Sequence, residues 1–153
     1  MMSHENYQTY FKGKKVTMLG LGLLGRGVNV AKFLAELGAE LLITDLKSKE
    51  ALASSCKQLK KFEERGQVQY VFGEHRLEDF RDCDMVIKAA GVPLDSPYVA
   101  EAKKNGIPVE MDASLFMKYS PAFTVGITGT RGKTTTTYLI HHILRTAGKK
   151  VFL

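Results

Sequence analysis

The sequence predicts an α/β protein with a parallel sheet and helices on both of its faces. Apolar runs of strand length alternate with helical periodicity along most of the 153 residues, and this alternation favours parallel strands joined by helical crossovers. Two glycine-rich segments, at residues 20–25 and 126–132, each stand between a predicted strand and a predicted helix. Such turns are typical of folds that bind nucleotide phosphates.

The first glycine-rich segment lies within a predicted strand–helix–strand unit. Lys14–Leu19 predicts a buried strand, residues 28–37 an amphipathic helix, and Glu40–Asp45 a second strand. After the first strand, Gly20-Leu-Gly-Leu-Leu-Gly25 matches G-x-G-x-x-G, whose glycines permit a tight turn and the approach of a ligand. Asp45, at the end of the second strand, can accept hydrogen bonds from a nucleoside. The unit therefore predicts a Rossmann-like nucleotide-binding fold, and a glycine turn needed only for packing is the alternative.

The following elements continue the alternation. Apolar side chains at helical spacing predict one further amphipathic helix, and the Ser96-Pro97 pair predicts the start of another, because proline suits the first helical turn. In chain order we expect a helix over Ser48–Arg65, a strand over Val68–Phe72, a helical turn over Arg76–Phe80, a strand over Asp84–Ala89, a helix over Pro97–Lys104, a strand over Ile107–Met111 and a short helix over Asp112–Tyr119.

The second glycine-rich segment has the layout of a phosphate-binding loop. An apolar strand is predicted over Ala122–Ile127 and a helix over Thr135–Thr146. Between them, glycines let the backbone N–H groups turn toward an anion, Lys133 can reach the outer phosphates, and the Thr134 hydroxyl can bind Mg²⁺. The strict motif G-x-x-x-x-G-K-[ST] has glycine where Ile127 stands, so this loop is a variant.

A domain boundary is predicted at Ser120-Pro121. The region 1–120 forms the Rossmann-like domain, whereas 121–153 contains only a strand, the loop, a helix and a second strand over Lys149–Leu153. A nucleotide-binding domain needs more strands than these. We therefore expect residues 121–153 to be the beginning of a truncated ATPase domain.

Bulk properties exclude several classes of protein. The net charge is +6, but the lysines are scattered and no aromatic platform is interleaved with them, which argues against nucleic-acid binding. Every apolar run is too short to cross a bilayer, and the polar residues 1–8 lack the apolar core of a signal peptide. Cys56 and Cys83 have no metal-binding spacing. We expect a cytoplasmic protein with reduced cysteines.

Together, the two loops resemble those of the Mur ligases, the ATP-dependent amino acid ligases of peptidoglycan synthesis. Thr128-Gly-Thr-Arg-Gly-Lys-Thr-Thr135 is similar to the ATP loop of that family, usually Thr-Gly-Thr/Ser-Asn-Gly-Lys-Thr/Ser. Leu19-Gly-Leu-Gly-Leu-Leu-Gly25, Thr44-Asp45 and Val86-Ile-Lys-Ala-Ala-Gly-Val-Pro93 look most like the members that add D-glutamate. The resemblance covers nearly the whole chain, but only the first domain and the start of the central ATPase domain of such an enzyme.

The resemblance implies a reaction, its substrates and its site residues. ATP, with Mg²⁺, would phosphorylate the carboxylate of UDP-N-acetylmuramoyl-L-alanine, and the amine of D-glutamate would then attack the acyl phosphate. Lys133 and Thr134 would be catalytic, and Thr134 would bind the metal. The UDP-substrate residues it implies are Gly20, Gly22, Leu23, Leu24, Gly25, Asp45 and Gly91, and the ATP-binding residues are Gly129, Thr130, Arg131, Gly132, Lys133, Thr134 and Thr135. It also implies a monomer. From the charge pattern and the lengths of the apolar runs we expect no binding of nucleic acid or membrane, and because residues 121–153 hold only part of an ATPase domain, we expect residues 1–153 alone to be inactive.

Four positions depart from the pattern of the family. Leu24 replaces a frequent Ser or Thr, Ala89-Ala90 replaces Ser/Asn-Pro, Ser114 replaces a second acid after Asp112, and Arg131 replaces Asn. Other readings also stay open: another Mur-type ligase, a relative of folylpolyglutamate synthase, an NAD(P)-binding oxidoreductase or sensor domain, and a nucleotide-binding module that acts through a partner.

Overall fold

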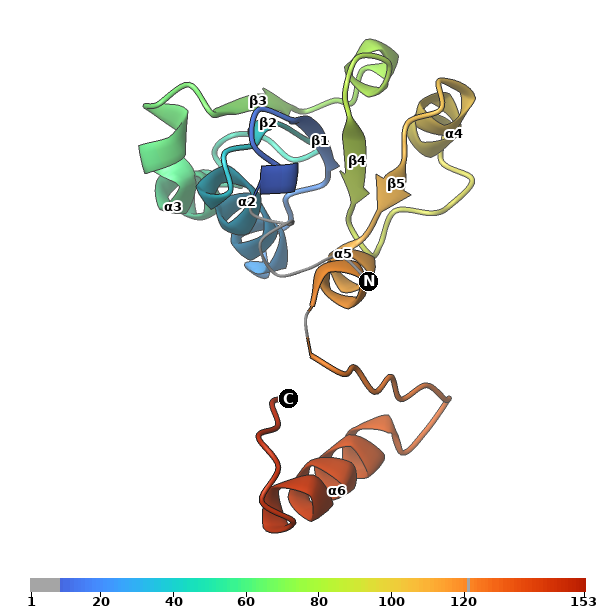
Figure 1. Ribbon diagram of the computed structural model, residues 1–153. Helices are drawn as coiled ribbons and strands as arrows, with labels where there is room; N and C mark the ends of the chain where they lie inside the picture. Colours follow the sequence, from blue (N-terminus) through green and yellow to red (C-terminus); the bar gives the residue numbers. More distant parts are fainter. Residues whose placement is uncertain (1–8, 121) are drawn as a thin grey trace. The chain divides into compact units, whose positions relative to one another are not determined.

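The structure, a computed structural model, describes residues 9–120 and 122–153 (Figure 1). The chain divides into two compact units, which we call unit 1 (Met1–Pro121) and unit 2 (Ala122–Leu153). Residues 1–8, in which no signal peptide is expected, lie outside the described residues, as does Pro121 of the expected boundary. No helix among the described residues is both long and apolar enough to span a membrane.

Unit 1 is built on a five-stranded sheet with the order β3-β2-β1-β4-β5, and every neighbouring pair is parallel. The central strand β1 places Val16 between Leu41 of β2 and Met85 of β4. The strands are β1 (Lys15–Leu19), β2 (Glu40–Asp45), β3 (Val68–Phe72), β4 (Met85–Lys88) and β5 (Val109–Glu110). The parallel α/β architecture expected from the sequence is thus confirmed.

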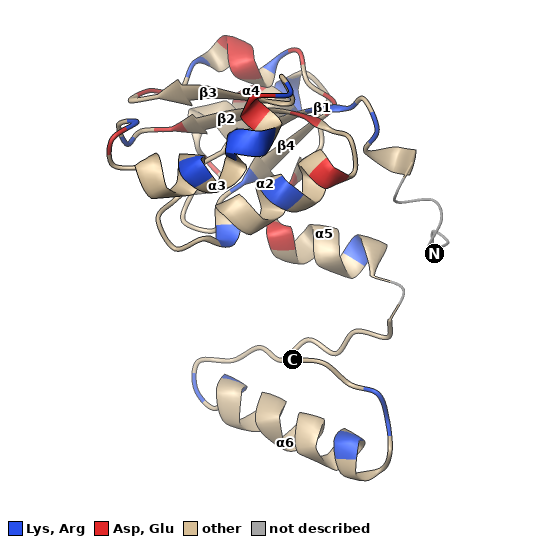
Figure 2. Ribbon diagram, turned by 90° about the vertical axis from the view of Figure 1, so that its left-hand side faces the viewer, with Lys and Arg blue, Asp and Glu red and all other residues tan. Residues whose placement is uncertain are grey.

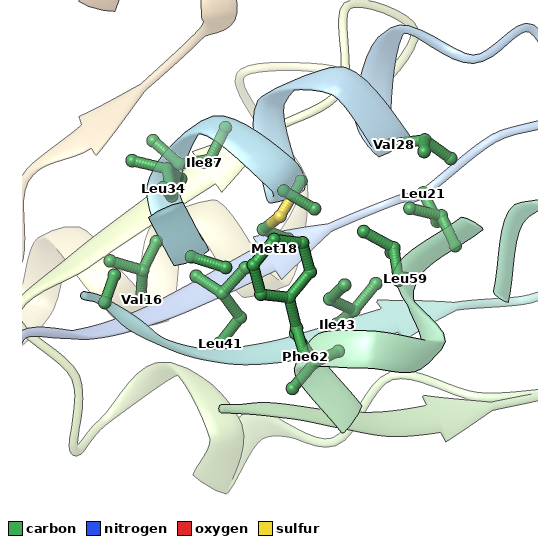
Figure 3. Packing of buried hydrophobic residues seen from close by; sticks show 14 of the residues in the cluster. Val16, Met18, Leu21, Val28, Leu34, Leu41, Ile43, Leu59, Phe62 and Ile87 are labelled. Carbon is green, nitrogen blue, oxygen red and sulfur yellow. The ribbon is translucent and has the colours of Figure 1, made fainter. Parts of the chain in front are cut away.

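Helices pack on both faces of this sheet, because alternate strand residues point to opposite sides. On one face, Met18 belongs to an apolar cluster that includes residues of α2 (Arg26–Glu36) and α3 (Ala53–Glu63) (Figure 3). On the other, Leu19 packs with a second cluster from the 3₁₀ helix η1 (Leu77–Phe80) and α4 (Pro97–Lys104). The last helix of the unit, α5 (Asp112–Tyr119), adds Leu115 to the first cluster.

Two expected boundaries in unit 1 are wrong, and both have a local cause. The helix expected from Ser48 begins only at Ala53, because residues 49–52 form turns in which the Ser48 carbonyl accepts the Leu52 N–H. The strand expected over Ile107–Met111 is reduced to Val109–Glu110. Pro108 has no N–H to donate, which shortens the ladder at this edge of the sheet.

Unit 2 contains one helix, α6 (Lys133–Thr146), among residues 122–153. The strands expected over Ala122–Ile127 and Lys149–Leu153 are wrong, since neither segment has strand structure. An extended segment becomes a strand only when a neighbour pairs with its backbone groups. Periodicity alone could not reveal whether these segments have such a neighbour.

A substitution at Gly27, the second residue of α2, tests how tightly this helix packs on the loop before it. A Cβ atom at Gly27 would lie 2.1 Å from the carbonyl oxygen of Leu21. Alanine normally favours a helix over glycine, yet we expect Gly27→Ala to lower the free energy of unfolding by about 2 kcal/mol because the backbone must shift. Urea denaturation measures the change. Gly91→Ala, where a Cβ meets nothing within 4 Å, is the control and should be nearly neutral. Equal effects of both substitutions would contradict this packing.

Candidate nucleotide-binding sites

A cleft opens where the strand order of the sheet reverses. The chain runs from β1 outward to β3, then returns to place β4 on the other side of β1. In open α/β sheets, ligands bind at the carboxyl ends of the strands at this point. The cleft here has a volume of about 250 Å³. The residues that line it come from the end of β1, the following loop, the start of α2, the end of β4 and the start of α5: Met18, Gly20, Leu21, Gly22, Leu23, Leu24, Arg26, Gly27, Val30, Ile87, Lys88, Ala89, Ala90 and Asp112.

The glycine loop after β1 forms one wall of the cleft. Gly20, Gly22 and Gly25 have φ angles of +97°, +70° and +81°, a region that favours glycine. Gly20 also lies against the loop after β4, since a Cβ there would come within 3.0 Å of the Ala89 Cβ. Leu21 is anchored in the core at 2% exposure. The loop is therefore curled by its glycines and fixed at one buried side chain.

Asp45 supports this loop from beneath. Its Oδ2 accepts the N–H groups of Leu21 at 2.9 Å and Gly22 at 3.0 Å, and its Oδ1 accepts the Lys47 N–H at 3.0 Å. The side chain is buried, and the Lys47 ammonium lies 3.8 Å from Oδ1. We expected this carboxylate to bind a nucleoside. The structure shows it bonded to the loop, and its contact with a nucleoside stays a prediction.

These contacts keep Asp45 ionised. Burial favours the neutral acid and is the largest single influence on the pKa. The backbone N–H bonds from Gly22, Lys47 and Leu21, with the charge of Lys47, together outweigh it and hold the pKa below its usual value. The carboxylate is thus a fixed negative charge that orients two N–H groups of the glycine loop.

His75 forms a hydrogen bond with Thr44, near the end of β2. Its Nδ1 lies 2.9 Å from the Thr44 hydroxyl, which donates to the Met18 carbonyl at 3.2 Å. The hydroxyl proton is used, so Nδ1–H is the donor in this pair. Burial lowers the pKa of His75 despite the nearby charges of Asp45 and Asp79. The imidazole is therefore neutral at pH 7 and supports the strand end that carries Asp45.

The expected UDP-substrate residues are only partly gathered in the cleft. Gly20, Gly22, Leu23 and Leu24 line it, and the last is 94% exposed. The remaining three lie next to it in the fold rather than in its lining: Gly25 precedes α2, Asp45 lies under the loop, and Gly91 follows Ala89 and Ala90.

The cleft lining also includes residues to which sequence reasoning assigned no role, among them Arg26, Gly27, Lys88 and Asp112. Gly27 could have been found from its position two residues after the motif. Lys88 is only 5% exposed, and its ammonium donates to the carbonyls of Val92 at 2.8 Å and Ala89 at 3.3 Å. It thereby shapes the loop that carries Gly91. No sequence signal pairs Arg26 with Asp112.

The loop expected to bind ATP lies in unit 2. Gly129 and Gly132 have φ angles of +146° and +77°, and Gly132 directly precedes the first residue of α6, Lys133. The Lys133 ammonium donates to the Gly129 carbonyl at 2.6 Å and so bridges the two ends of the loop. Thr130, Arg131, Thr134 and Thr135 are exposed. All seven expected ATP-binding residues therefore belong to one continuous turn and the helix start that follows it.

Unit 2 is strongly basic. It holds five Lys and Arg residues and neither Asp nor Glu, which accounts for five of the six net positive charges of the chain (Figure 2). An anion is therefore attracted to the α6 end of the loop, where the helix dipole is positive. The expected role of the Thr134 hydroxyl in binding Mg²⁺ stays a prediction, and such loops also use an acidic residue. No group of three metal-binding side chains occurs among the described residues.

Comparison with family models identifies both units. The model described as Mur ligase MurD-like, N-terminal domain, matches residues 14–110. The model described as Mur ligase middle domain matches residues 127–153. The two matches hold the glycine loop and the ATP loop, respectively.

Named relatives agree with these matches. The UDP-N-acetylmuramoylalanine–D-glutamate ligase of Roseiflexus sp. (strain RS-1) is 39% identical over 133 residues, which is 87% of this chain and 28% of that relative. The enzyme of the same name from Treponema pallidum (strain Nichols) is 38% identical over 150 residues, 97% of this chain and 28% of that relative. The chain thus spans little more than a quarter of the length of these relatives.

Solved structures show the same fold. UDP-N-acetylmuramate-alanine ligase MurC from Thermotoga maritima superposes with a TM-score of 0.54 at 28% identity, covering 92% of this chain and 31% of that one. A pseudomurein peptide ligase type C from Methanothermus fervidus has a TM-score of 0.52 at 23% identity, covering 89% of this chain and 27% of that one.

Removal of the Asp45 charge tests its support of the loop. Asp45→Asn should lower the free energy of unfolding at pH 7 by about 1–3 kcal/mol, because charge-assisted bonds to buried N–H groups are lost. Chemical denaturation measures the loss. Asp95→Asn, at an exposed loop acid, is the matched control and should change stability by less than about 0.5 kcal/mol.

The effect of Asp45 should also depend on pH. Its pKa in the folded protein is lowered, so its contribution is complete above the unfolded pKa of about 3.9 and is lost as pH falls through the folded value. The stability difference between wild type and Asp45→Asn should therefore be constant near neutrality and shrink below about pH 4. The same difference at pH 3 and pH 7 would show that the charge contributes nothing.

Proposed function

The chain belongs to the Mur ligase family, and we propose that it supplies the UDP-substrate-binding domain and the ATP loop of a ligase that joins D-glutamate to UDP-N-acetylmuramoyl-L-alanine. One observation carries the proposal: a glycine-lined cleft at the switch point of the sheet and a phosphate-type loop occur together, each inside its own family match. The names of the relatives supply the choice of D-glutamate and of the UDP-linked substrate.

In this proposal, unit 1 binds the UDP of the substrate in its cleft. The N–H groups of Gly20, Leu21 and Gly22 are bonded to Thr44 and Asp45. The diphosphate would therefore meet the later part of the loop, Leu23–Gly25, and the positive end of α2 that follows it. Leu23 and Leu24, 58% and 94% exposed, would cover the ligand from the side of the loop. Asp45 and Gly91, at the ends of the neighbouring segments, would lie toward the uracil.

Unit 2 contributes the residues that handle the transferring phosphate. Bound ATP would supply the phosphoryl group for the substrate carboxylate, and the amine of D-glutamate would displace phosphate from the resulting acyl phosphate. Lys133 would exchange the Gly129 carbonyl for the outer phosphates and neutralise the charge that develops on them. Thr134 would hold Mg²⁺, and the N–H groups between Gly129 and Thr135 would surround the phosphates.

The two regions have separate tasks in this proposal, with residues 1–120 as the substrate domain and 121–153 as the start of the central ATPase domain. We place the ligase in the cytoplasm as a monomer. Residues 1–153 by themselves are proposed to be inactive, since their relatives are more than three times as long. The loss of positioning for one reactant alone can forfeit about 7–11 kcal/mol.

Ligand preference tests the substrate class. Calorimetric titration of the chain should show binding of UDP and UDP-N-acetylmuramoyl-L-alanine and no response to NADH. Leu24→Thr restores a hydroxyl near the phosphates, so it should tighten UDP binding about 2- to 10-fold, the value of one hydrogen bond. Leu94→Thr, at another exposed leucine outside the cleft lining, is the control. Micromolar binding of NADH without a response to UDP would instead support an oxidoreductase or sensor domain.

Replacement of the loop lysine tests the role of unit 2. In a ligase polypeptide that includes these residues, Lys133→Ala should reduce turnover at least about 100-fold, because its charge acts on the developing phosphate charge. Phosphate release with ATP, Mg²⁺, D-glutamate and UDP-N-acetylmuramoyl-L-alanine measures it. Lys149→Ala removes a charge outside the loop and should retain turnover. Near-normal turnover of Lys133→Ala would show that the loop has only a structural role.

The proposed inactivity of residues 1–153 alone can be tested with the same assay. Substrate-dependent release above about 1 per second by residues 1–153 alone would refute it.

A further inference from the structure

The mouth of the cleft carries a cation that the glycine motif does not require. Arg26 is the first residue of α2 and lines the cleft, with its side chain 67% exposed. Its Nε and Nη2 groups both donate to Oδ2 of Asp112, at 3.0 Å and 2.5 Å. Asp112 lies 86 positions further along the chain, at the first residue of α5, and also lines the cleft. The pair therefore joins two helix starts across the ligand side of the sheet.

Arg26 can exchange its contact with Asp112 for a contact with another anion. The guanidinium is largely exposed and uses a single carboxylate oxygen, and exposed pairs of this kind contribute little to stability. The other oxygen, Oδ1, accepts the Ala113 N–H at 2.8 Å, so Asp112 has a separate role in its own helix. Arg26 can consequently leave the carboxylate without unfolding either helix.

The chemistry of the cleft leaves Arg26 as its side-chain donor for an anion. Leu24, at the tip of the loop, has no hydroxyl, and the Lys88 ammonium is turned to the carbonyls of Ala89 and Val92. A guanidinium presents parallel N–H groups that match two oxygens of a phosphate, and a diphosphate offers more negative charge than a carboxylate. A phosphate in the cleft would thus compete directly with Asp112.

We infer that Arg26 binds the diphosphate of the nucleotide ligand and that Asp112 holds its guanidinium in the absence of ligand. The inference rests on the proposed UDP-substrate function of the cleft and names the residue that replaces the absent hydroxyl. Binding exchanges one ion pair for another, so Asp112 acts as an internal competitor of the phosphate. The two substitutions that break the pair therefore have opposite effects on affinity.

The experiment titrates UDP, and separately inorganic pyrophosphate, into the full chain and its variants by calorimetry. Arg26→Gln should weaken UDP binding about 10-fold or more, the value of a charge-assisted contact. Asp112→Asn should tighten it several-fold because the competitor is gone. Arg26→Lys should restore part of the affinity, since it keeps the charge without the fork. Lys32→Gln removes one positive charge from the same helix outside the cleft lining and should leave affinity within about 2-fold.

The outcomes separate the two proposals. Equal affinities for Arg26→Gln and Lys32→Gln overturn the role of Arg26, even where the wild type binds UDP well. A loss of affinity in Asp112→Asn overturns the competition and makes the pair a positioning device. Pyrophosphate binding that depends on Arg26, without any UDP binding, supports the anion site and refutes the UDP function. Wild-type protein that binds neither probe overturns both. Denaturation midpoints of the variants, expected to match wild type, exclude misfolding as the cause.

Discussion

The hydrogen bonds that the Asp45 carboxylate accepts are the interaction on which the cleft of unit 1 depends. The carboxylate is buried at the end of β2, yet its oxygens accept N–H groups from the loop that follows β1. Ser55 of α3 adds a bond from its hydroxyl to the Gly22 carbonyl at 3.3 Å. The position of the loop in turn sets the start of α2, because Gly27 packs directly on the Leu21 carbonyl. The ionised Asp45 side chain therefore positions one wall of the cleft and the start of α2 beside it.

The two glycine-rich loops have similar backbone geometry, but different groups hold them in place. Both use a glycine with positive φ, Gly25 or Gly132, immediately before a helix, which brings unpaired N–H groups toward one point. In unit 1 the sheet and a buried acid hold the loop. In unit 2, α6 has no buried residue, and the loop is bridged by Lys133, a residue proposed to act in catalysis. The first loop is thus preformed, whereas the second is held by a contact that ATP would replace.

The charged residues also differ between the two units. All charged residues of unit 2 are Lys or Arg, which favours the binding of a polyphosphate. Acids that complete a Mg²⁺ site would come from residues other than 122–153. The cleft of unit 1 is lined mostly by apolar and glycine residues, with Arg26, Lys88 and Asp112 as its charged groups. Each of these is engaged by another group of the protein. A ligand in this cleft would be selected by the exchange of such contacts rather than by net charge.

The sequence by itself determined the alternation of strands and helices in unit 1 and the positions of the two glycine-rich loops. It could do so because strand periodicity, turn glycines and helix starts are local properties of the chain. Only the tertiary structure decided that Asp45 bonds to the loop, that Arg26 meets Asp112, and that the segments at 122–127 and 149–153 form no strands. These features depend on which distant segments become neighbours in the sheet or at its edge, and a pattern of single residues does not contain that pairing.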